Sequence, residues 1–348
     1  MSQNVLNTSA VLYAPGDLRI EARPHPAPSE HEVIVEVGAV GICGSDVHYY
    51  EHGRIGDFIV QAPMIIGHES AGTIVEVGAG VDRGRLGQLV AIEPGVPDRV
   101  CEECLQGRYN LCPAVRFFAT PPVDGSITRF VAIDASFAHP VPGSLDVERA
   151  AMAEPVSVAV WACRKAGVSV GDDVLVTGAG PIGLFAAQVA RAFGAASVTV
   201  TDVSGFRLSI AEQLGFIAQD ACQPIAGTFD VLLECSGAAR ALQDGIRRLR
   251  PAGRAVLIGM GSDTVALDVS VIQSRELSIS GIFRYANTYP TALDLIASGG
   301  VDVDAIITHR FSLADTERAL TLARRDPASL KAVVIIREPT DDRVKPSA

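Results

Sequence analysis

The sequence has no long hydrophobic run and no long run of basic residues. No stretch approaches the ~20 apolar residues that a helix needs to cross a bilayer. Residues 1–10 lack the charged and apolar regions of a secretory signal. The formal net charge of −11 leaves no visible basic face for a nucleic acid or an anionic membrane. We therefore expect a cytoplasmic protein with a small-molecule partner and with neither nucleic acid nor membrane as a partner.

Cysteine is scarce as well. Seven cysteines in 348 residues are too few for a disulfide scaffold. Three of them, Cys101, Cys104 and Cys112, fall within twelve residues, which in a reducing compartment indicates metal ligation. The chain is 48% hydrophobic and longer than a usual single domain, which favours about two domains.

The first ~150 residues are typical of a compact β domain, with short alternating runs separated by Gly and Pro. The expected strands are 32–37, 71–77, 88–92 and 128–133. From about Leu145 the pattern changes to a helix over 146–166, in which Pro155 should start a new turn or a bend.

After residue 170 short apolar strands alternate with helices, which predicts parallel βαβ units covered on both sheet faces. The expected strands are 173–177, 197–201, 229–235 and 254–259, and the expected helices are 181–193, 204–214 and 238–249. Helices at 290–297 and 315–324 and a strand at 331–336 follow.

A G-x-G-x-x-G motif at Gly178, Gly180 and Gly183 stands between an expected strand and an expected helix. The first glycine permits a tight turn, the second lets the backbone approach a pyrophosphate, and the third allows close helix–strand packing. The next strand ends at Asp202, whose carboxylate can accept both ribose hydroxyls and would repel a 2′-phosphate. The pattern therefore predicts a site for NAD rather than NADP.

Two segments of the β-rich half carry candidate zinc ligands: Cys43 in Gly-Ile-Cys-Gly-Ser-Asp (41–46), and His68 with Glu69 after Gly67. Thiolate, imidazole and carboxylate all bind zinc, and three protein ligands leave the open position of a catalytic site. Each residue alone also has an ordinary explanation, as a small buried cysteine or a solvated turn.

Together with the dinucleotide motif, these segments resemble the zinc-containing medium-chain dehydrogenase/reductase superfamily and, more narrowly, its sorbitol/xylitol (polyol) dehydrogenase branch. The resemblance runs from about Ala10 to about Arg337. It rests on Gly-Ile-Cys-Gly-Ser-Asp-Val-His-Tyr at 41–49, Phe-Ala-Thr-Pro-Pro at 118–122, Glu-Pro-Val-Ser-Val at 154–158 and Phe-Arg-Tyr-Ala-Asn-Thr at 283–288.

The resemblance implies Cys43, His68 and Glu69 as catalytic zinc ligands, with Glu154 reaching the metal directly or through a water. Ser45 matches the hydroxyl that passes the substrate proton outward, and Asp46 the carboxylate that orients His68. His48 either extends this relay or is a simple surface or packing histidine.

The same resemblance implies a substrate pocket and a set of cofactor contacts. The pocket residues are Tyr49, Phe117, Thr120, Glu154, Arg284 and Tyr285, although Tyr49 and Phe117 are also compatible with ordinary core packing. The cofactor residues are Gly178, Gly180, Pro181, Ile182, Gly183, Asp202, Arg207, Ile258, Phe283 and Arg284.

The cysteine cluster resembles the structural zinc lobe of the superfamily, with one departure. The family spacing is C-x2-C-x2-C-x7-C, and here Asp98 stands at the first position, ahead of Cys101, Cys104 and Cys112. Either Asp98 completes a Cys3Asp zinc site, since aspartate oxygen is an acceptable ligand, or the lobe binds zinc poorly and folds without it.

The resemblance implies a fold and a reaction. The fold is α/β: a GroES-like β-rich catalytic domain at 1–153 and 287–348, with a Rossmann NAD-binding domain, a doubly wound parallel sheet, at 154–286. Zinc lowers the pKa of a secondary hydroxyl of a sugar alcohol, Ser45 takes the proton, and hydride passes to NAD to leave the ketose.

The alternatives are another zinc alcohol dehydrogenase, acting on secondary alcohols or threonine, and a non-catalytic NAD-binding relative. Family members are dimers or tetramers, so we expect a homo-oligomer, with 267–283 as its assembly surface. Between Gly215 and Phe229 a βα unit is expected to be shortened.

Overall fold

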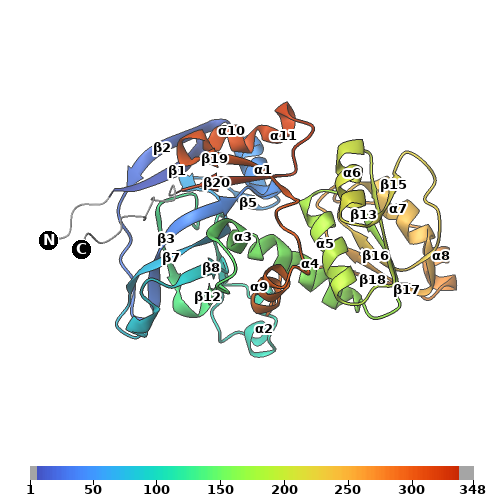
Figure 1. The fold of residues 1–348 in the computed structure, drawn as a ribbon, viewed down its shortest axis with the longest axis horizontal. Helices are drawn as coiled ribbons and strands as arrows, with labels where there is room; N and C mark the ends of the chain where they lie inside the picture. Colours follow the sequence, from blue (N-terminus) through green and yellow to red (C-terminus); the bar gives the residue numbers. More distant parts are fainter. Residues whose placement is uncertain (1–5, 337–348) are drawn as a thin grey trace, which may run out of the picture.

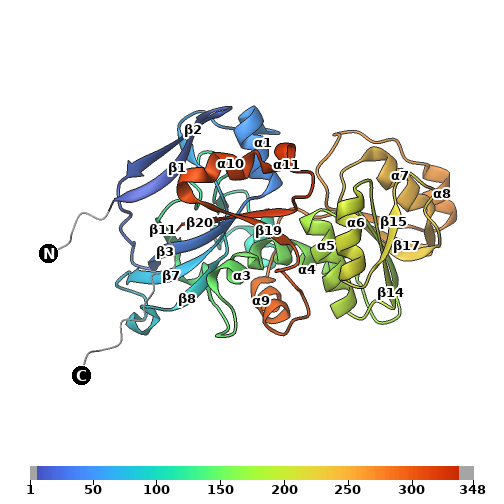
Figure 2. The same cartoon turned by 45° about the horizontal axis from the view of Figure 1, so that its top comes forward.

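The computed structural model describes residues 6–336, which form two sheet-based parts (Figure 1). The β-rich part contains a seven-stranded sheet of order β12-β8-β7-β3-β20-β19, in which β11 also pairs with β3. Its second layer is a three-stranded sheet of order β2-β1-β6. In both views the C-terminal helices α10 and α11 lie on this part, although they follow the other part in sequence (Figures 1 and 2).

The strands of the β-rich part are β1 (Asn7–Ala14), β2 (Asp17–Arg23), β3 (Glu32–Gly41), β4 (Arg54–Ile55), β5 (Phe58–Ile59), β6 (Met64–Ile65), β7 (Glu69–Val77), β8 (Leu89–Ile92), β9 (Gly95–Val96), β10 (Arg116–Phe117), β11 (Phe130–Asp134), β12 (Ala138–Pro140), β19 (Ile307–Ser312) and β20 (Lys331–Ile335). Its helices are α1 (Gly44–His52), α2 (Glu102–Leu105), α3 (Val147–Ala151), α9 (Tyr289–Ala297), α10 (Thr316–Leu320) and α11 (Leu322–Arg325), with 3-10 turns η1 (Arg83–Arg85), η2 (Tyr109–Leu111), η3 (Ala135–Phe137) and η4 (Leu313–Asp315).

The other part is a six-stranded parallel sheet of order β15-β14-β13-β16-β17-β18. This is the doubly wound dinucleotide-binding order, whose ligand crevice opens where the strand order reverses, between β13 and β16. The strands are β13 (Asp173–Thr177), β14 (Ser197–Asp202), β15 (Ile217–Asp220), β16 (Phe229–Glu234), β17 (Leu249–Leu257) and β18 (Ser278–Gly281). The helices are α4 (Ala153–Ala166), α5 (Pro181–Ala192), α6 (Gly205–Gln213), α7 (Ala239–Arg247) and α8 (Val269–Ser274).

The crossover from β15 to β16 is shortened, as the sequence predicts. Residues 221–228 contain no helix. Instead Ile225 is buried in a cluster with Phe229, Leu232 and Leu242, so it covers part of the sheet face that a crossover helix would cover. The side-chain amide of Gln219 holds the short loop by bonding both backbone groups of Ala226.

The expected helix over 146–166 is divided into α3 and α4 at Met152. The break therefore precedes Pro155, which lies in the first turn of α4, where the missing N–H costs no hydrogen bond. The expected helix 238–249 ends at Arg247 because Leu249 begins β17. The expected helix 315–324 is two short helices, α10 and α11.

One continuous apolar core joins the two parts. It includes Ala39 and Val333 from the large mixed sheet together with Val156 on α4 and Leu184 on α5. Beside it, the buried Gln188 of α5 bonds both backbone groups of Asp302, in the segment after α9. These contacts fix the dinucleotide-binding helix against the β-rich part.

Candidate active site and metal lobe

Cys43, His68 and Glu69 meet in one cluster, with one ligand atom from each lying within 4.8 Å of the others. Cys43 caps α1 directly after β3, and Glu69 opens β7, whose pairing with β3 sets Gly41 opposite Glu69. A Cβ on Gly41 would lie 2.1 Å from Glu69 Oε2. Glycine is therefore needed there for the carboxylate to reach the cluster.

Asp46 ties the two ligand-bearing segments together. Its two carboxylate oxygens accept hydrogen bonds from the backbone N–H groups of Cys43 (2.9 Å) and Gly67 (3.0 Å). Its Oδ1 lies 3.5 Å from Nδ1 of His68, which leaves the other ring nitrogen for a metal. Burial opposes the charge of Asp46, but His68 and the two backbone donors hold the pKa of this carboxyl below its usual value.

Lys331, which the sequence analysis missed, is the buried cation beside the cluster. Its Nζ donates to Glu69 Oε1 at 2.6 Å and also contacts Oε2, while the residue is only 3% exposed. Burial disfavours the ammonium, yet Glu69 and Cys43 raise the pKa of Lys331 above its ordinary value. The available signal was a lysine at the head of the apolar strand β20.

A cavity of about 380 Å³ opens beside this cluster. The predicted residues that line it are Cys43, Ser45, Tyr49, His68, Glu69, Phe117, Thr120, Glu154, Ile182, Ile258, Phe283 and Arg284. The hairpin residues Ile55 and Phe58 also line it, and no motif had singled them out. Tyr285 does not line the cavity but donates to Glu154 at 2.7 Å from behind it.

His48 is not part of this arrangement. It is exposed on α1 and contacts the ring of His52 at 4.6 Å, and it does not line the cavity. Of the two alternatives for His48, the structure favours the surface histidine over the proton relay.

Glu154 and Arg284 are the charged groups of the cavity wall. Burial, together with the charge of Glu69, raises the pKa of Glu154 to about 7, although His68 opposes this shift. Arg284 stacks on Phe117, with its guanidinium carbon 3.9 Å from the ring centre, and donates to Thr120 at 3.4 Å. The wall is therefore largely apolar, with a few polar groups held in place.

The glycine-rich turn has the geometry that the motif predicts. A Cβ on Gly183 would lie 1.8 Å from the carbonyl oxygen of Gly178, whereas at Gly180 the nearest atom is 4.0 Å away. Gly183 is thus required for helix–strand packing, and the backbone at Gly180 is open to a ligand. A second cavity of about 290 Å³ runs past Gly180, Pro181, Ile182 and Gly183 and shares Cys43 and Glu69 with the first.

Asp202 lies at the carboxyl end of β14, next to this turn. It is buried, and its carboxylate accepts hydrogen bonds from the backbone N–H groups of Ala179 (2.7 Å) and Ser204 (2.8 Å). Arg207 lies 3.9 Å from it and is the nearest side chain to Gly180. The carboxylate is therefore fixed where a ribose attached to a phosphate on the turn would lie.

Asp98, Cys101, Cys104 and Cys112 form a second cluster with ligand atoms within 4.8 Å of one another. We call residues 98–112 the metal lobe. Oδ1 of Asp98 accepts hydrogen bonds from the backbone N–H groups of Val100 and Cys101. These hydrogen bonds hold the pKa of Asp98 well below its usual value. An ionised carboxylate among three thiols is a donor set that suits zinc, so the residues fit a four-ligand structural site.

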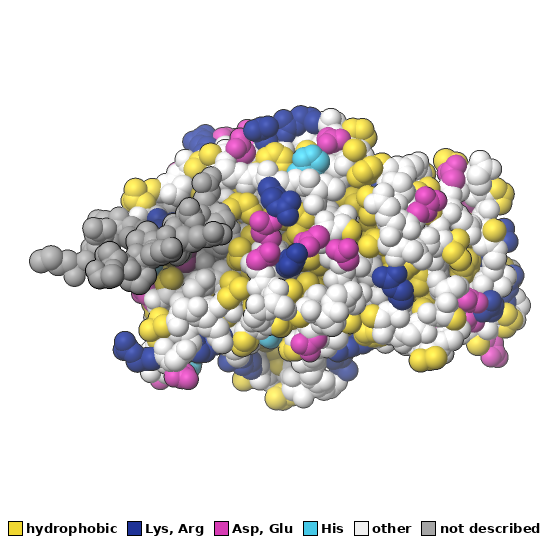
Figure 3. All heavy atoms as spheres, in the orientation of Figure 1, with side chains coloured by type: hydrophobic (Ala, Val, Ile, Leu, Met, Phe, Trp, Pro, Cys, Tyr) yellow, Lys and Arg dark blue, Asp and Glu magenta, His cyan; other side chains and the backbone are white. Residues whose placement is uncertain are grey.

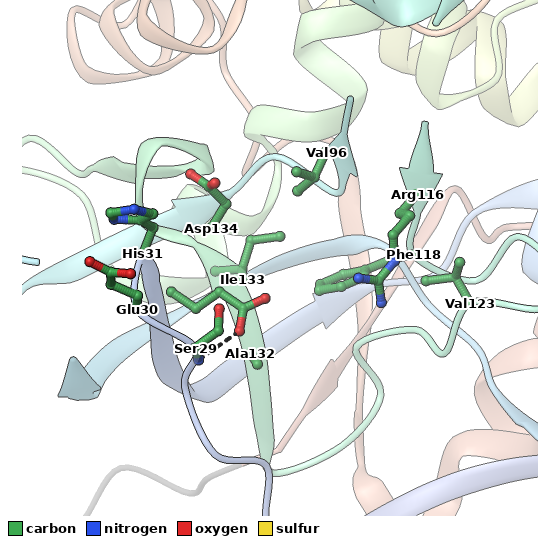
Figure 4. Close-up of a pocket in the computed structure, with 11 residues that line it drawn as sticks. Ser29, Glu30, His31, Val96, Arg116, Phe118, Val123, Ala132, Ile133 and Asp134 are labelled. Carbon is green, nitrogen blue, oxygen red and sulfur yellow. Dashed lines mark hydrogen bonds between the residues drawn. The ribbon is translucent and has the colours of Figure 1, made fainter. Parts of the chain in front are cut away.

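A separate cavity of about 320 Å³ lies on the β-rich part (Figure 4). Arg116 and Phe118 lie on one side of it and Glu30 and His31 on the other. None of the predicted site residues lines it, so it is not the candidate active site.

On the face shown in Figure 3, basic and acidic side chains lie close together over α10 and α11. Arg318 pairs with Asp315 and Arg324 with Glu51. Among residues 6–336, no helix combines the length and the apolar character that a membrane crossing requires.

Comparison with known proteins agrees with this geometry. Residues 29–143 match the model of the alcohol dehydrogenase GroES-like domain, and residues 181–298 match that of the zinc-binding dehydrogenases. Sorbitol dehydrogenase of Bos taurus is 45% identical over 96% of this chain and 97% of its own length, and that of Homo sapiens is 46% identical over 90% and 91%.

Solved structures give the same result. An Escherichia coli oxidoreductase of unknown specificity superposes with a TM-score of 0.91 at 33% identity, covering 96% of this chain and all of that one. L-idonate 5-dehydrogenase of E. coli gives 0.90 at 29% identity, with 95% and 99% covered. The chain therefore belongs to the zinc-dependent medium-chain dehydrogenase/reductase superfamily, in its polyol dehydrogenase branch. It is an NAD-dependent oxidoreductase that acts on a CH–OH group.

Proposed function

We propose that this enzyme oxidises a secondary hydroxyl of a sugar alcohol of the sorbitol or xylitol type to the ketose, with NAD as hydride acceptor. The observation that carries the proposal is the wall of the cavity beside Cys43, His68 and Glu69. Glu154, Arg284 and further polar side chains project there from an otherwise apolar lining. A hydroxylated chain needs such partners, because desolvating its hydroxyls in an apolar slot would be costly.

The Cys43, His68 and Glu69 cluster would hold a catalytic zinc, which supplies Lewis acidity that lowers the pKa of the substrate hydroxyl. Ser45, at the start of α1 and on the cavity wall, relays the released proton outward: its hydroxyl accepts that proton while it gives its own proton to water. Glu154, fixed by the Tyr285 hydroxyl, binds the substrate beside its reacting carbon.

Other cavity residues position the substrate. Arg284 and Thr120 bind hydroxyls along the substrate chain, and Tyr49 and Phe117 close the cavity against water. The protein thereby fixes the carbinol carbon against the nicotinamide.

For the cofactor we propose that the pyrophosphate lies on the backbone of Gly178, Gly180 and Gly183 at the N-terminus of α5, with Pro181 and Ile182 beside it. Asp202 and Arg207 bind the adenosine ribose. Ile258, Phe283 and Arg284 line the nicotinamide end of the cavity. The buried carboxylate of Asp202 favours NAD, because it would repel a 2′-phosphate.

The domain division is part of the same proposal. The catalytic domain comprises residues 1–153 and 287–348 and the NAD-binding domain residues 154–286, with 1–5 and 337–348 outside the described residues. The seven-stranded and the six-stranded sheets support this division. We place the enzyme in the cytoplasm, where the thiols of both metal clusters stay reduced.

We propose that the enzyme is a homo-oligomer, a dimer or a tetramer. Its interface lies at residues 267–283, where β18 forms the open edge of the parallel sheet and Val269 is 61% exposed. Light scattering on the purified protein should give two or four times the chain mass of 36.5 kDa. A monomer would contradict this part of the proposal.

The function is tested by NAD reduction with a panel of sorbitol, xylitol, ribitol, galactitol, 2-propanol and threonine. Polyols should have the highest kcat/KM, and Arg284→Leu should reduce kcat/KM for them far more than for 2-propanol. A preference for 2-propanol or threonine would overturn the polyol assignment and leave the superfamily intact.

A further inference from the structure

The metal lobe contacts the segment that carries Arg284 and Tyr285. The seven residues 105–111 join two members of the lobe cluster, Cys104 and Cys112, and they lie against residues 283–287. We call residues 283–287 the pocket segment. The two stretches are more than 170 positions apart in sequence, as the pair of Asn110 and Phe283 shows.

Three hydrogen bonds join the lobe to the pocket segment. Asn110 Nδ2 donates to the carbonyl oxygen of Phe283 at 2.9 Å, and Asn110 is only 5% exposed. The backbone N–H of Asn287 donates to the Tyr109 hydroxyl at 2.8 Å, and Asn287 Nδ2 donates to the carbonyl oxygen of Gly107 at 3.1 Å. The lobe is thus hydrogen-bonded to both ends of the pocket segment, Phe283 and Asn287.

The pocket segment needs such support, because its backbone is strained. Arg284 and Asn287 have φ angles of 55° and 57°, in the left-handed region, which asparagine tolerates but a residue such as arginine rarely adopts. Such conformations persist when neighbouring structure holds them. Between these two residues stands Tyr285, whose hydroxyl fixes Glu154.

We propose that metal binding in the lobe positions the substrate pocket. The ion held by Asp98, Cys101, Cys104 and Cys112 closes the 105–111 loop at both ends, and the loop holds the pocket segment through Asn110. Asn110 is accordingly a positioning residue. This inference rests on the proposed Cys3Asp site and extends the proposed function from the catalytic cluster to the lobe.

Asp98 is both a proposed metal ligand and the hydrogen-bond acceptor for the backbone that leads to Cys101. Its Oδ1 accepts the N–H groups of Val100 and Cys101 and lies 3.3 Å from Cys104 Sγ. The Sγ atoms of Cys101 and Cys104 are 3.4 Å apart. Without a metal these thiols have only weak hydrogen bonds to hold them together, so the two ends of the loop between Cys104 and Cys112 are no longer joined. The loop then keeps the hydrogen bond from the Tyr109 hydroxyl to Glu93 (2.6 Å) as an anchor that does not depend on the metal.

The test compares zinc content and hydrogen exchange in the original full chain and in four variants of it. Asp98→Asn keeps an oxygen for the two backbone donors and removes the charge that binds the metal. Zinc content should fall from two to one per chain. Exchange in peptides covering 283–287 should accelerate at least about tenfold, the signature of local opening. Asp98→Cys, which restores a four-cysteine site, should keep two zinc ions and the slow exchange of the original protein.

Asn110→Ala separates the contact from the metal. It should keep two zinc ions, accelerate exchange at 283–287, and raise KM for polyols about five- to tenfold while KM for 2-propanol stays unchanged. Leu105→Ala is the matched control, because Leu105 lies in the same loop and is 77% exposed. It should change neither zinc content nor exchange.

Two outcomes would overturn the inference. One is an Asp98→Asn protein that loses the second zinc with unchanged exchange at 283–287, and the other is an original protein that never binds a second zinc. Exchange is measured without substrate, so this result is independent of the polyol assignment. If polyols are not oxidised, the proposed function fails while the exchange data still decide the coupling.

Discussion

At the proposed catalytic cluster, two buried charged residues that are not among the proposed zinc ligands contact the three that are. Asp46 joins Cys43 and His68 through backbone and ring contacts, and Lys331 contacts both carboxylate oxygens of Glu69. Both charges are buried, so they are sustained by these partners and would be costly in isolation. The ligand geometry is thus set before any metal arrives.

Replacing Asp46 by Asn tests this support. The substitution removes the charge that fixes the ring of His68, so zinc affinity of the catalytic cluster should fall about 10- to 100-fold. Competition with a chelating dye measures the affinity. Asp82→Asn, at an exposed 3-10 turn, is the control. An unchanged affinity in Asp46→Asn would show that Asp46 serves the fold alone.

The metal-free protein should become less stable as pH rises from about 4.5 to about 7. Burial raises the pKa of Glu154 from 4.5 to about 7, so across this window the folded chain keeps a proton that the unfolded chain releases. Stability associated with that proton is complete below the lower pKa and lost above the higher one. Urea unfolding of the chelator-treated protein at a series of pH values measures the effect.

Glu154→Gln removes this titration and should flatten the pH profile of the metal-free protein between these limits. If the substituted and original proteins show the same slope, Glu154 is not the titrating group. Bound zinc should instead favour the ionised form of Glu154 over the protonated form, because a cation stabilises a nearby carboxylate charge.

Among the elements, the turn between β13 and α5 separates a packing role from a binding role. A methyl group on Gly183 would meet the carbonyl oxygen of Gly178, whereas one on Gly180 meets nothing closer than 4.0 Å. The two positions of one motif therefore require glycine for different physical reasons.

Gly183→Ala should lower the free energy of unfolding by about 1–3 kcal/mol, since the backbone must shift to admit the methyl group. Gly180→Ala should fold with unchanged stability and bind NAD more weakly, because its methyl stands where the pyrophosphate approaches. Urea unfolding and NAD titration by fluorescence measure the two effects. Equal stability losses in both proteins would refute the separation.

Element boundaries were harder to predict than the elements themselves. Alternating strands and helices from residue 173 onward predicted the four central strands of the parallel sheet and the shortened crossover before β16, but no strand was predicted at β15. Pro155 predicted a new turn within the 146–166 helix, and α4 does begin with Pro155 in its first turn. The exact position of the break, Met152, was not predicted, because it depends on the tertiary packing of α3 on the mixed sheet and of α4 on α5.

For the whole molecule, motifs placed the ligand and cofactor residues on two parts of the fold, and packing brings them to one cleft. The spacing of Cys43, His68 and Glu69 made them candidate ligands, and the resemblance to the superfamily predicted them as a zinc site. Neither the contact of Lys331 with Glu69 nor the hydrogen bond from Asn110 to Phe283 could be predicted, because both contacts join positions far apart in sequence. Such contacts depend on the three-dimensional arrangement alone.

The most direct test of the central claim combines zinc content per chain with NAD reduction across the polyol panel. The protein should contain about two zinc ions per chain and oxidise polyols fastest, and Cys43→Ser should lose one zinc together with the activity. A protein that binds NAD and its full zinc but reduces no NAD with any polyol would contradict it.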